Sequence, residues 1–577
     1  MDAQAEYRRR LNDSRQRAEA GRRRDLRFGA AKLGMAAGWV AAAWLSWVRH
    51  WWSGLWVALA FAVLAALFVL HAQAIAARAR AERAVRFYQR GLARLQGGWS
   101  GTGAAGERFR DPEHPYADDL DLFGPGSLFE LLSTARTPMG EECLAAWMRS
   151  PAEPGVIAER QRQVAAWRNE LELREAVASV GDDLKQELRP ARLAQWAIAR
   201  SSLQGRAARA AYALVAVGAV GALLYGLGTA RMETFFGLVA LEVVLVYRRR
   251  SAVEETIADL GANGQGLRLF AEILSQAPGA RSAGGAPALR RLAKLADWIE
   301  ASESMIGRIL DYVVLYSLQL GYFAEAWRRR YGPQMASWLQ TVGEFEALLS
   351  LASHAYEHPG DPFPEVVPGA AMEYEGKELG HPLLPEEVCV RNSVRLDEST
   401  RLLLVSGSNM SGKSTLLRTV GVNAVLAQMG GPVRARSLRL TPLALGTRLR
   451  TADSLQKGRS GFYAEILRLR QVVELTAGRL PLLFLFDELL EGTNSHDRVV
   501  GAAGLLRALL AQPALGLVTT HDLSLTALAE ELGPAVRNVH LEDQIEGNDV
   551  HFDHKLRDGV VTKSNALALM RIIGLKV

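Results

Sequence analysis

A glycine-rich loop in the last third of the chain has the spacing of a phosphate-binding loop. Residues 407–415 read GSNMSGKST and fit the pattern G-x-x-x-x-G-K-[ST], directly after the strand-like run RLLLV at 401–405. Such glycines let backbone N–H groups turn towards phosphate oxygens, and the helix that follows adds its positive N-terminal end. We expect Lys413 to contact the β- and γ-phosphates of a nucleotide and Ser414 to bind Mg²⁺. The expected phosphate-binding residues are Gly407, Ser408, Asn409, Met410, Ser411, Gly412, Lys413, Ser414 and Thr415.

Two further strand-like runs end in residues that suit phosphate chemistry. The run LLFLF at 482–486 is followed by Asp487 and Glu488, and the run LGLV at 515–518 leads to Thr520 and His521. We expect Asp487 to bind Mg²⁺ directly or through water, and Glu488 to polarise the attacking water. The carboxyl ends of parallel strands form the edge of a sheet where nucleotides bind. His521 is therefore expected to sense the γ-phosphate.

These motifs together resemble the ATPase domain of the MutS family of DNA mismatch repair proteins. The family's loop typically reads G-P-N-M-G-G-K-S-T, so Ser408 and Ser411 replace Pro and Gly here. Residues 453–465 resemble the family's D-x-x-x-x-G-x-S-x-F-x-x-E segment, and residues 487–497 resemble its D-E-x-x-x-G-T-x-x-x-D segment. The T-H motif and the closing G-x-x-x-K-S segment are matched at 520–521 and 559–564. A weaker resemblance, to the start of the family's helical core, covers residues 122–151, with a T-P-x-G element at 137–140.

From about residue 372, short apolar runs alternate with helical stretches, a pattern that predicts an α/β domain over residues 372–577. The resemblance implies that this domain is an ABC-like P-loop NTPase with ATP and Mg²⁺ as its ligands. It also implies a homodimer in which Ser460 reaches the γ-phosphate held by the opposite subunit. The alternative for Ser460 is a local one, because helical spacing at 462–473 makes it a candidate N-cap. The expected catalytic residues are Glu488, His521 and Ser460, and the expected metal ligands are Ser414 and Asp487.

The N-terminal part of the chain contains two long apolar runs. Residues 33–48 form 16 uncharged residues, and residues 51–77 form 27 residues without Asp, Glu, Lys or Arg. A helix needs about 20 apolar residues to span a bilayer. Four tryptophans, at positions 44, 47, 51 and 52, lie where an aromatic belt is expected. We predict a transmembrane hairpin over 28–77; a cleaved signal peptide and the buried hairpin of a soluble protein are the alternatives.

A second pair of apolar segments is predicted at about 210–247. Residues 210–230 are uncharged, whereas residues 234–247 contain Glu242 and are the weakest of the four segments. That last segment is alternatively an ordinary core helix. Residues 1–27 contain nine arginines, and further arginines flank both pairs. The positive-inside rule then predicts a multi-pass protein of the inner cell membrane with both termini in the cytoplasm. Nucleic-acid binding is the alternative for these arginines.

Composition limits the remaining classes. The chain has 577 residues, a net charge of +6, 49% hydrophobic residues and two cysteines. These values exclude a disordered chain, a disulfide scaffold and a Cys-rich metal site. Helical spacing dominates from about 120 to 351, and the proline-rich stretch 358–369 marks a boundary. The expected multidomain order is a basic cytoplasmic segment at 1–27, the hairpin at 28–77, an all-α core at 78–360 and the ATPase at 372–577.

The sequence therefore predicts a membrane-anchored, MutS-like ATPase that moves a helical core. DNA is the partner that the resemblance implies, although no mismatch-reading domain with a Phe-x-Glu wedge precedes the core. Two alternatives have no DNA role: an ABC-type transporter, and a membrane scaffold with an ATP-driven switch. The transporter's LSGGQ-type signature is absent, and KGRSGFYAE at 457–465 occupies the equivalent place.

Overall fold

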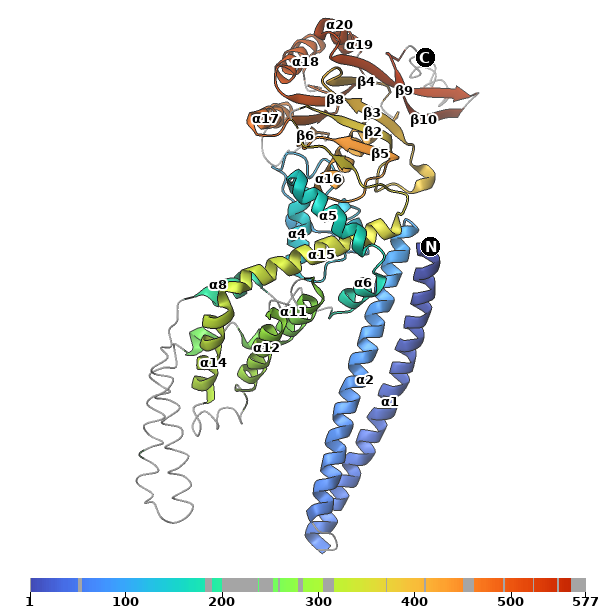
Figure 1. The fold of residues 1–577 in the computed structure, drawn as a ribbon. Helices are drawn as coiled ribbons and strands as arrows, with labels where there is room; N and C mark the ends of the chain where they lie inside the picture. Colours follow the sequence, from blue (N-terminus) through green and yellow to red (C-terminus); the bar gives the residue numbers. More distant parts are fainter. Residues whose placement is uncertain are drawn as a thin grey trace.

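The protein is a helical body with an α/β domain at one end and a long two-helix hairpin projecting away from it (Figure 1). The computed structural model describes residues 2–49, 54–181, 189–199, 237, 253–257, 260–278, 284–302, 304, 316–369, 371–408, 411–449, 461–490, 493–521, 523–546 and 549–561. The second predicted hairpin, at 210–247, lies outside these residues except for Gly237.

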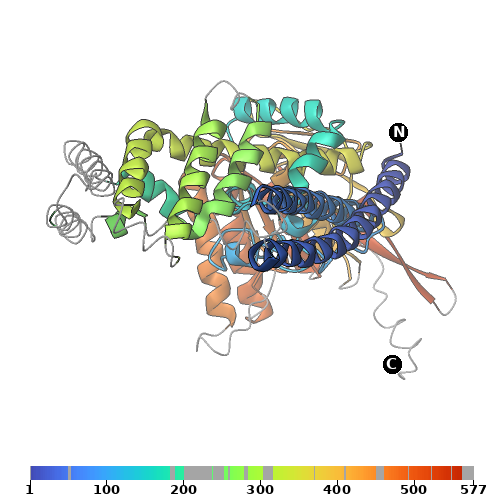
Figure 2. The same cartoon turned by 90° about the horizontal axis from the view of Figure 1, so that it is seen from below.

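The hairpin consists of α1 (Ala3–Arg49) and α2 (Gly54–Leu95), which lie side by side in both views (Figures 1 and 2). The basic N-terminal segment and the first apolar run belong to the same helix, α1. Close approach near the base depends on glycine, because a Cβ at Gly91 would lie 2.5 Å from the ring of Tyr7. Among the described residues, one segment, Ala58–Leu95, is long and apolar enough to cross a membrane.

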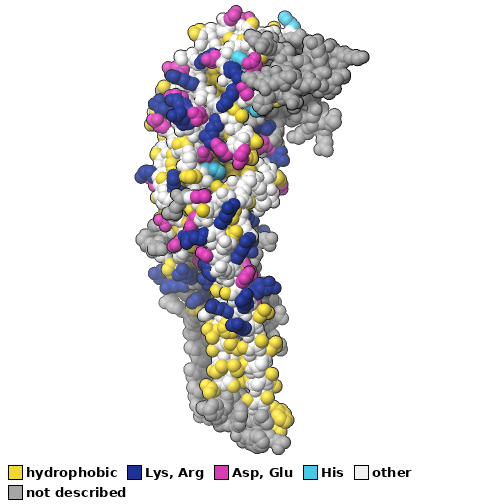
Figure 3. Space-filling model, turned by 90° about the vertical axis from the view of Figure 1, so that its right-hand side faces the viewer, with side chains coloured by type: hydrophobic (Ala, Val, Ile, Leu, Met, Phe, Trp, Pro, Cys, Tyr) yellow, Lys and Arg dark blue, Asp and Glu magenta, His cyan; other side chains and the backbone are white. Residues whose placement is uncertain are grey.

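The distal half of the hairpin exposes its apolar side chains. Only 6% of the apolar window in α2 is buried, and Leu33 and Trp47 of α1 are 76% and 81% exposed. Figure 3 shows hydrophobic side chains gathered over this distal part, with Lys and Arg side chains directly above them. An exposed apolar surface of this size is typical of a membrane or protein contact site.

The middle of the chain is helical, as its sequence predicts. The long helix α15 (Met335–Glu357) runs through it and ends close to the base of the hairpin (Figure 1). Thr137 caps α4, where its Oγ1 accepts a hydrogen bond from Gly140 N at 3.1 Å, and Pro138 occupies the first turn. The other helices here are α3 (Leu128–Leu132), α4 (Pro138–Arg149), α5 (Pro154–Trp167), α6 (Leu171–Ala178), α8 (Pro190–Ile198), α11 (Gly264–Gln276), α12 (Gly285–Ser302) and α14 (Tyr316–Tyr331).

The C-terminal domain is the α/β unit that the alternating apolar and helical stretches predict. Its main sheet has the order β10-β9-β4-β8-β7-β6, in which β10 is antiparallel to β9 and the other pairs are parallel. The strands are β4 (Leu402–Ser406), β6 (Ala444–Arg448), β7 (Leu482–Phe486), β8 (Ala514–Thr520), β9 (Val536–Glu546) and β10 (Asp549–Asp558). The helices are α16 (Lys413–Met429), α17 (Gly461–Glu474), α18 (Ser495–Leu510), α19 (Leu523–Thr526) and α20 (Leu528–Leu532).

A smaller sheet lies beside the main one. Its order is β1-β5-β2-β3, and β2 pairs with both of its neighbours in antiparallel fashion. Its strands are β1 (Glu365–Val366), β2 (Tyr374–Leu379), β3 (Asn392–Leu396) and β5 (Ser437–Leu440). The smaller sheet carries one side of the cavity described below.

One hydrophobic core joins the C-terminal domain to the segment that follows the hairpin. Buried residues between Trp99 and Met148 belong to the same cluster as those of β4, β7 and α16. Leu120 packs so closely on α16 that a Cβ at Gly421 would lie 2.6 Å from its side chain. A buried polar contact crosses the same boundary, since Thr447 Oγ1 donates to Asp119 Oδ2 at 2.7 Å. The C-terminal sheet is therefore covered on one side by residues far upstream in the chain.

Candidate nucleotide-binding site

The glycine-rich loop connects β4 to α16, as its sequence context predicts. Gly412 has φ +97°, a left-handed conformation that favours glycine, immediately before α16 begins at Lys413. The Lys413 side chain is buried, and its Nζ donates to the carbonyl oxygens of Gly407 and Ser408 at 2.8 and 2.7 Å. Ser411 Oγ donates to Ser408 O at 2.8 Å. These contacts curl the loop around the lysine ammonium group at the positive end of α16.

The two expected acidic residues follow β7, and Glu488 faces the same lysine. The Glu488 carboxylate lies 3.5 Å from Lys413 Nζ, and the same oxygen lies 3.3 Å from His521 Nδ1. Thr519, at the end of β8, accepts a hydrogen bond from Glu488 N at 3.1 Å and donates one to Asp487 Oδ1. The structure thus brings the lysine at the start of α16 together with four residues from the ends of β7 and β8.

Expected metal ligands are also close to this edge. Ser414 lies in the first turn of α16, and Asp487 directly follows β7. Hydroxyl and carboxylate oxygens are hard donors of the kind that Mg²⁺ prefers. The donor set therefore fits the ion. Asn409, Met410 and Ser460 lie outside the described residues.

A buried ion pair supports the turn that holds the acidic residues. Arg448 Nη2 lies 3.1 Å from Glu465 Oε2, and both side chains are buried. The other amino group of Arg448 donates to Asp487 O and Glu488 O at 2.6 and 3.2 Å. Glu465 Oε1 accepts from Leu490 N at 2.8 Å. Glu488 and Leu490 both have positive φ, at 51° and 57°, so this turn depends on external support.

Sequence reasoning missed Arg448 and gave Glu465 no role beyond a place in a motif. A charged residue at the end of an apolar run is the sequence feature that could have identified them. Arg448 ends the run LALGTR at 443–448, where an unpaired guanidinium would be costly to bury. Such a residue predicts a buried acidic partner, although the sequence does not say which one.

A histidine of β10 also contacts the loop, and an asparagine of β3 holds that part of β10 in place. His554 of β10 donates from Nδ1 to Ser411 O at 2.9 Å, and it has φ +50°. Asn392 of β3 fixes this histidine, because its Nδ2 donates to His554 O at 2.9 Å and its Oδ1 accepts from Leu556 N at 2.9 Å. Sequence reasoning missed both, since 162 residues separate them along the chain.

A cavity of about 150 Å³, open to solvent on one side, lies between these residues and α16. Burial lowers the pKa of His381 in its wall to about 4, with Arg418 adding to the effect, so that imidazole is neutral at pH 7. The lining is largely apolar, and its residues are Leu379, His381, Leu384, Val388, Val390, Asn392, Gly412, Thr415, Leu416, Thr419 and His554. A flat apolar ring next to the phosphate loop is the group that suits this cavity.

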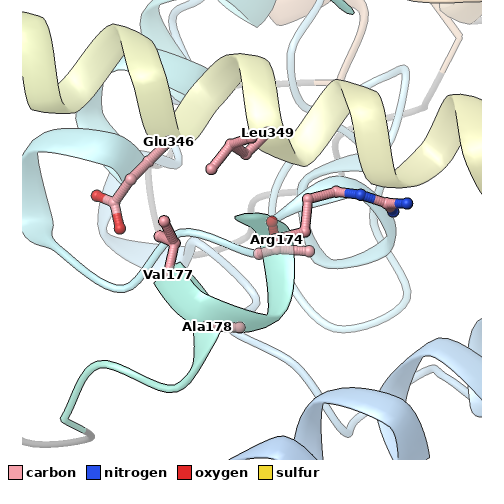
Figure 4. A pocket seen from close by; sticks show the side chains of 6 residues that line it. Arg174, Val177, Ala178, Glu346 and Leu349 are labelled. Atoms are coloured by element: carbon pink, nitrogen blue, oxygen red, sulfur yellow. The ribbon is translucent and has the colours of Figure 1, made fainter. Parts of the chain in front are cut away.

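A second, smaller cavity lies between α6 and α15 (Figure 4). The Glu346 carboxylate and the Arg174 guanidinium point away from each other there, so they do not neutralise one another. Glu346 instead accepts hydrogen bonds from Arg136 N and Thr137 N, at 2.8 and 3.3 Å, and from the hydroxyl of Thr137. Burial raises its pKa to about 7. This carboxylate joins α15 to the start of α4, far from the loop.

Comparison with known proteins finds similarity in the same C-terminal region. Residues 403–576 match the family model of MutS domain V. The DNA mismatch repair protein MutS of Streptococcus uberis (strain ATCC BAA-854 / 0140J) is 34% identical over 188 residues, which cover 32% of this chain. The matched region spans 22% of that relative's length.

Proposed function

Because residues 403–576 match the family model of MutS domain V, we propose that this protein is a membrane-anchored ATPase whose nucleotide cycle moves its helical core. The observation that carries the ATPase proposal is the convergence of Lys413 and His521 on one carboxylate oxygen of Glu488. A cation, a carboxylate and an imidazole at a phosphate loop are the groups that hydrolysis of a phosphoanhydride requires.

Each residue has a distinct role in the proposed reaction. Lys413 and the backbone N–H groups at the start of α16 neutralise the β- and γ-phosphates. Glu488 accepts a proton from the water that attacks the γ-phosphorus, while the bond from that phosphorus to the β-phosphate oxygen breaks and ADP leaves. His521, whose Nδ1 lies 3.3 Å from the Glu488 carboxylate, orients it. Ser414 and Asp487 would hold Mg²⁺, which offsets negative charge on the phosphate oxygens. The cavity beside His554 receives the adenine ring.

Phosphate release by the purified full-length protein tests this activity directly. Wild-type protein should release phosphate from ATP in the presence of Mg²⁺, and Lys413→Ala should release none above background. Equal release by the two proteins would remove the glycine-rich loop from the reaction.

The proposed anchor is the distal half of the α1–α2 hairpin. Its support is the exposed apolar surface on both helices, which a soluble protein rarely leaves uncovered. The second hairpin, at about 210–247, would add two more spans. The arginines on the near side of the apolar surface support a cytoplasmic location for both termini and the ATPase, by the positive-inside rule. Wild-type protein should stay in the membrane pellet after high salt and carbonate washes, and deleting residues 28–77 should weaken that retention. Recovery of the wild type in the soluble fraction without detergent would refute the anchor.

A homodimer is the proposed active form, with Ser460 of one subunit reaching the γ-phosphate held by the other. Ser460→Ala and Lys413→Ala proteins should each be inactive. Mixed dimers would contain one site with both defects and one intact site, so mixing should restore part of the turnover. If Ser460 only caps its own helix, Ser460→Ala should keep its turnover and lose roughly 0.5–2 kcal/mol of stability instead.

Duplex DNA is the proposed partner of the helical core, following the relative described above as a DNA mismatch repair protein. DNA should stimulate the ATPase, and stimulation should fall steeply with salt because phosphate contacts release counterions. A scaffold whose switch acts on a membrane protein would show no such stimulation at any salt concentration.

A further inference from the structure

A group of arginines surrounds the α1–α2 hairpin at the level where its apolar half begins. The group, which we call the arginine annulus, is exposed to solvent, and its members are Arg22, Arg23, Arg24 and Arg27 of α1 and Arg80 of α2. Within the described part of the chain, none of the five has a carboxylate within ion-pair distance. Leu26, in the midst of the annulus, is 70% exposed.

The side of α1 that faces α2 is defined by other residues. A Cβ at Gly21 would lie 2.9 Å from Arg78 Cβ, and Asp25 bonds to His71 and Arg78 at 2.6 and 2.8 Å. Phe28 stacks on His71 with ring centroids 5.8 Å apart. Positions 21, 25 and 28 lie on one face of a helix.

The consecutive arginines therefore point in directions spread over the part of the α1 surface that does not face α2. Successive residues of an α-helix are rotated by about 100°, so Arg22, Arg23 and Arg24 occupy three different directions. All three directions lie outside the sector of about 60° that Gly21, Asp25 and Phe28 share. Arg80 lies two residues from Arg78, and thus on the side of α2 that faces away from α1.

The inward and outward arginines at this level differ in how they are neutralised. Arg78, between the helices, donates to Asp25 and to Glu82, both at 2.8 Å. Among the residues that the structure describes, no carboxylate lies within ion-pair distance of the outward arginines. The charge of Arg78 is thus neutralised inside the hairpin, whereas the arginines of the annulus can bind an external anion.

We propose that the arginine annulus binds the anionic headgroups of membrane phospholipids. This inference rests on the proposed membrane anchoring. The annulus on α1 runs from residue 22 to 27 and is about 7.5 Å tall along the helix axis. A headgroup layer is roughly 5–8 Å thick on each side of the hydrocarbon core, so the two dimensions agree. Lipid headgroups also surround a helix on all sides at one depth, as the annulus does.

Duplex DNA fits this arrangement less well. A rigid duplex contacts one face of a helix, so its phosphates need a stripe of basic residues along that face. The annulus instead spreads its charges around the helix within a short axial distance. Directly below it, the exposed apolar side chains continue along both helices (Figure 3).

The test compares two lipids in a neutral detergent with full-length protein. Binding of short-chain phosphatidylglycerol and phosphatidylcholine is measured for wild type, for Arg22→Gln/Arg23→Gln/Arg24→Gln, and for a matched triple variant. The matched variant, Arg290→Gln/Arg291→Gln/Lys294→Gln, removes the same charge from exposed positions of α12. At about fivefold per basic residue, the first triple variant should lose on the order of a hundredfold in phosphatidylglycerol affinity. The α12 variant should keep the wild-type preference.

Two results would overturn the proposal: equal affinity of wild type for the two lipids, or an unchanged preference in the annulus variant. Loss of affinity for a short DNA duplex in the annulus variant, with its lipid preference intact, would assign the arginines to DNA. Carbonate resistance reports on the apolar anchor separately, and the annulus variant should retain it. Release of wild type by carbonate, with the lipid preference intact, would refute the anchor and leave the headgroup site standing.

Discussion

The guanidinium of Arg94 in α2 donates two hydrogen bonds to the carboxylate of Glu357, the last residue of α15, at 2.7 and 2.5 Å. Tyr7 of α1 donates a third hydrogen bond to the same carboxylate at 3.1 Å. The Arg94 and Glu357 side chains are 8% and 0% exposed. The base of the hairpin is thereby fixed to the helix that leads into the nucleotide-binding domain.

Removing one member of this pair should destabilise the whole protein. Arg94→Ala leaves a buried carboxylate without its cation, which costs about 3–5 kcal/mol. Thermal unfolding of the full chain in detergent should show a lowered midpoint. Arg90→Ala, an exposed position one turn earlier in α2, is the control and should change the midpoint little. Equal shifts in the two variants would show that the pair contributes nothing specific.

Glu488→Gln should separate nucleotide binding from hydrolysis. The amide cannot accept the proton of the attacking water, so turnover should fall by about 10²–10⁴. Binding of a fluorescent ATP analogue should persist, because Lys413 and the loop are unchanged. Glu474→Gln, an exposed position in α17, is the control that should keep full turnover. Wild-type turnover in Glu488→Gln would remove this residue from the catalytic role.

Arg448 should affect turnover only by holding the backbone of Asp487 and Glu488 in position. Arg448→Met releases the carbonyl groups of Asp487 and Glu488, and small displacements at a reacting centre can cost about 10²-fold in rate. Nucleotide affinity should change far less than kcat. The double variant Arg448→Met/Glu465→Met replaces the buried pair by apolar side chains and should recover much of the lost stability. Turnover should stay low in the double variant; recovery of turnover with stability would make the pair purely structural.

Stability should depend on pH through Glu346. Its pKa lies at about 7 in the folded protein and near 4.5 when unperturbed, so the folded state binds the proton more tightly. The contribution is fully present below about pH 4.5 and is lost as pH rises through 7, amounting to about 3 kcal/mol. Glu346→Gln should flatten the profile of melting temperature between pH 5 and pH 8. Glu344→Gln, an exposed neighbour in α15, should leave the profile unchanged, and a wild-type slope in Glu346→Gln would contradict this assignment.

The residues that sequence placed together correctly share one property. Lys413, Asp487, Glu488 and His521 each follow an apolar run, and parallel strands bring their carboxyl ends to one edge. The local sequence pattern and the geometry of a parallel sheet were therefore sufficient to predict that these residues meet. The division into a helical middle and a C-terminal α/β domain was predictable for the same reason, since the apolar period changes near residue 372.

Contacts set by tertiary pairing were not predictable. His554 reaches the loop only because β10 folds back on β9 and Asn392 arrives from another sheet. The sequence around Arg448 and Glu465 does not indicate that these two residues form an ion pair. Likewise, the apolar side chain of Leu120 predicts that this residue is buried, but the neighbouring sequence does not indicate that α16 packs on it.

The core shared between residues 99–148 and the C-terminal sheet also constrains how the protein is made. Asp119 leaves the ribosome 328 residues before its partner Thr447. At about 5–20 residues per second, that interval lasts roughly 15 to 65 seconds. The α1–α2 hairpin has left the ribosome by then, while the apolar side chains from Trp99 onward still lack their cover. A nascent chain that carries this open apolar surface is prone to aggregate until the last sheet is complete.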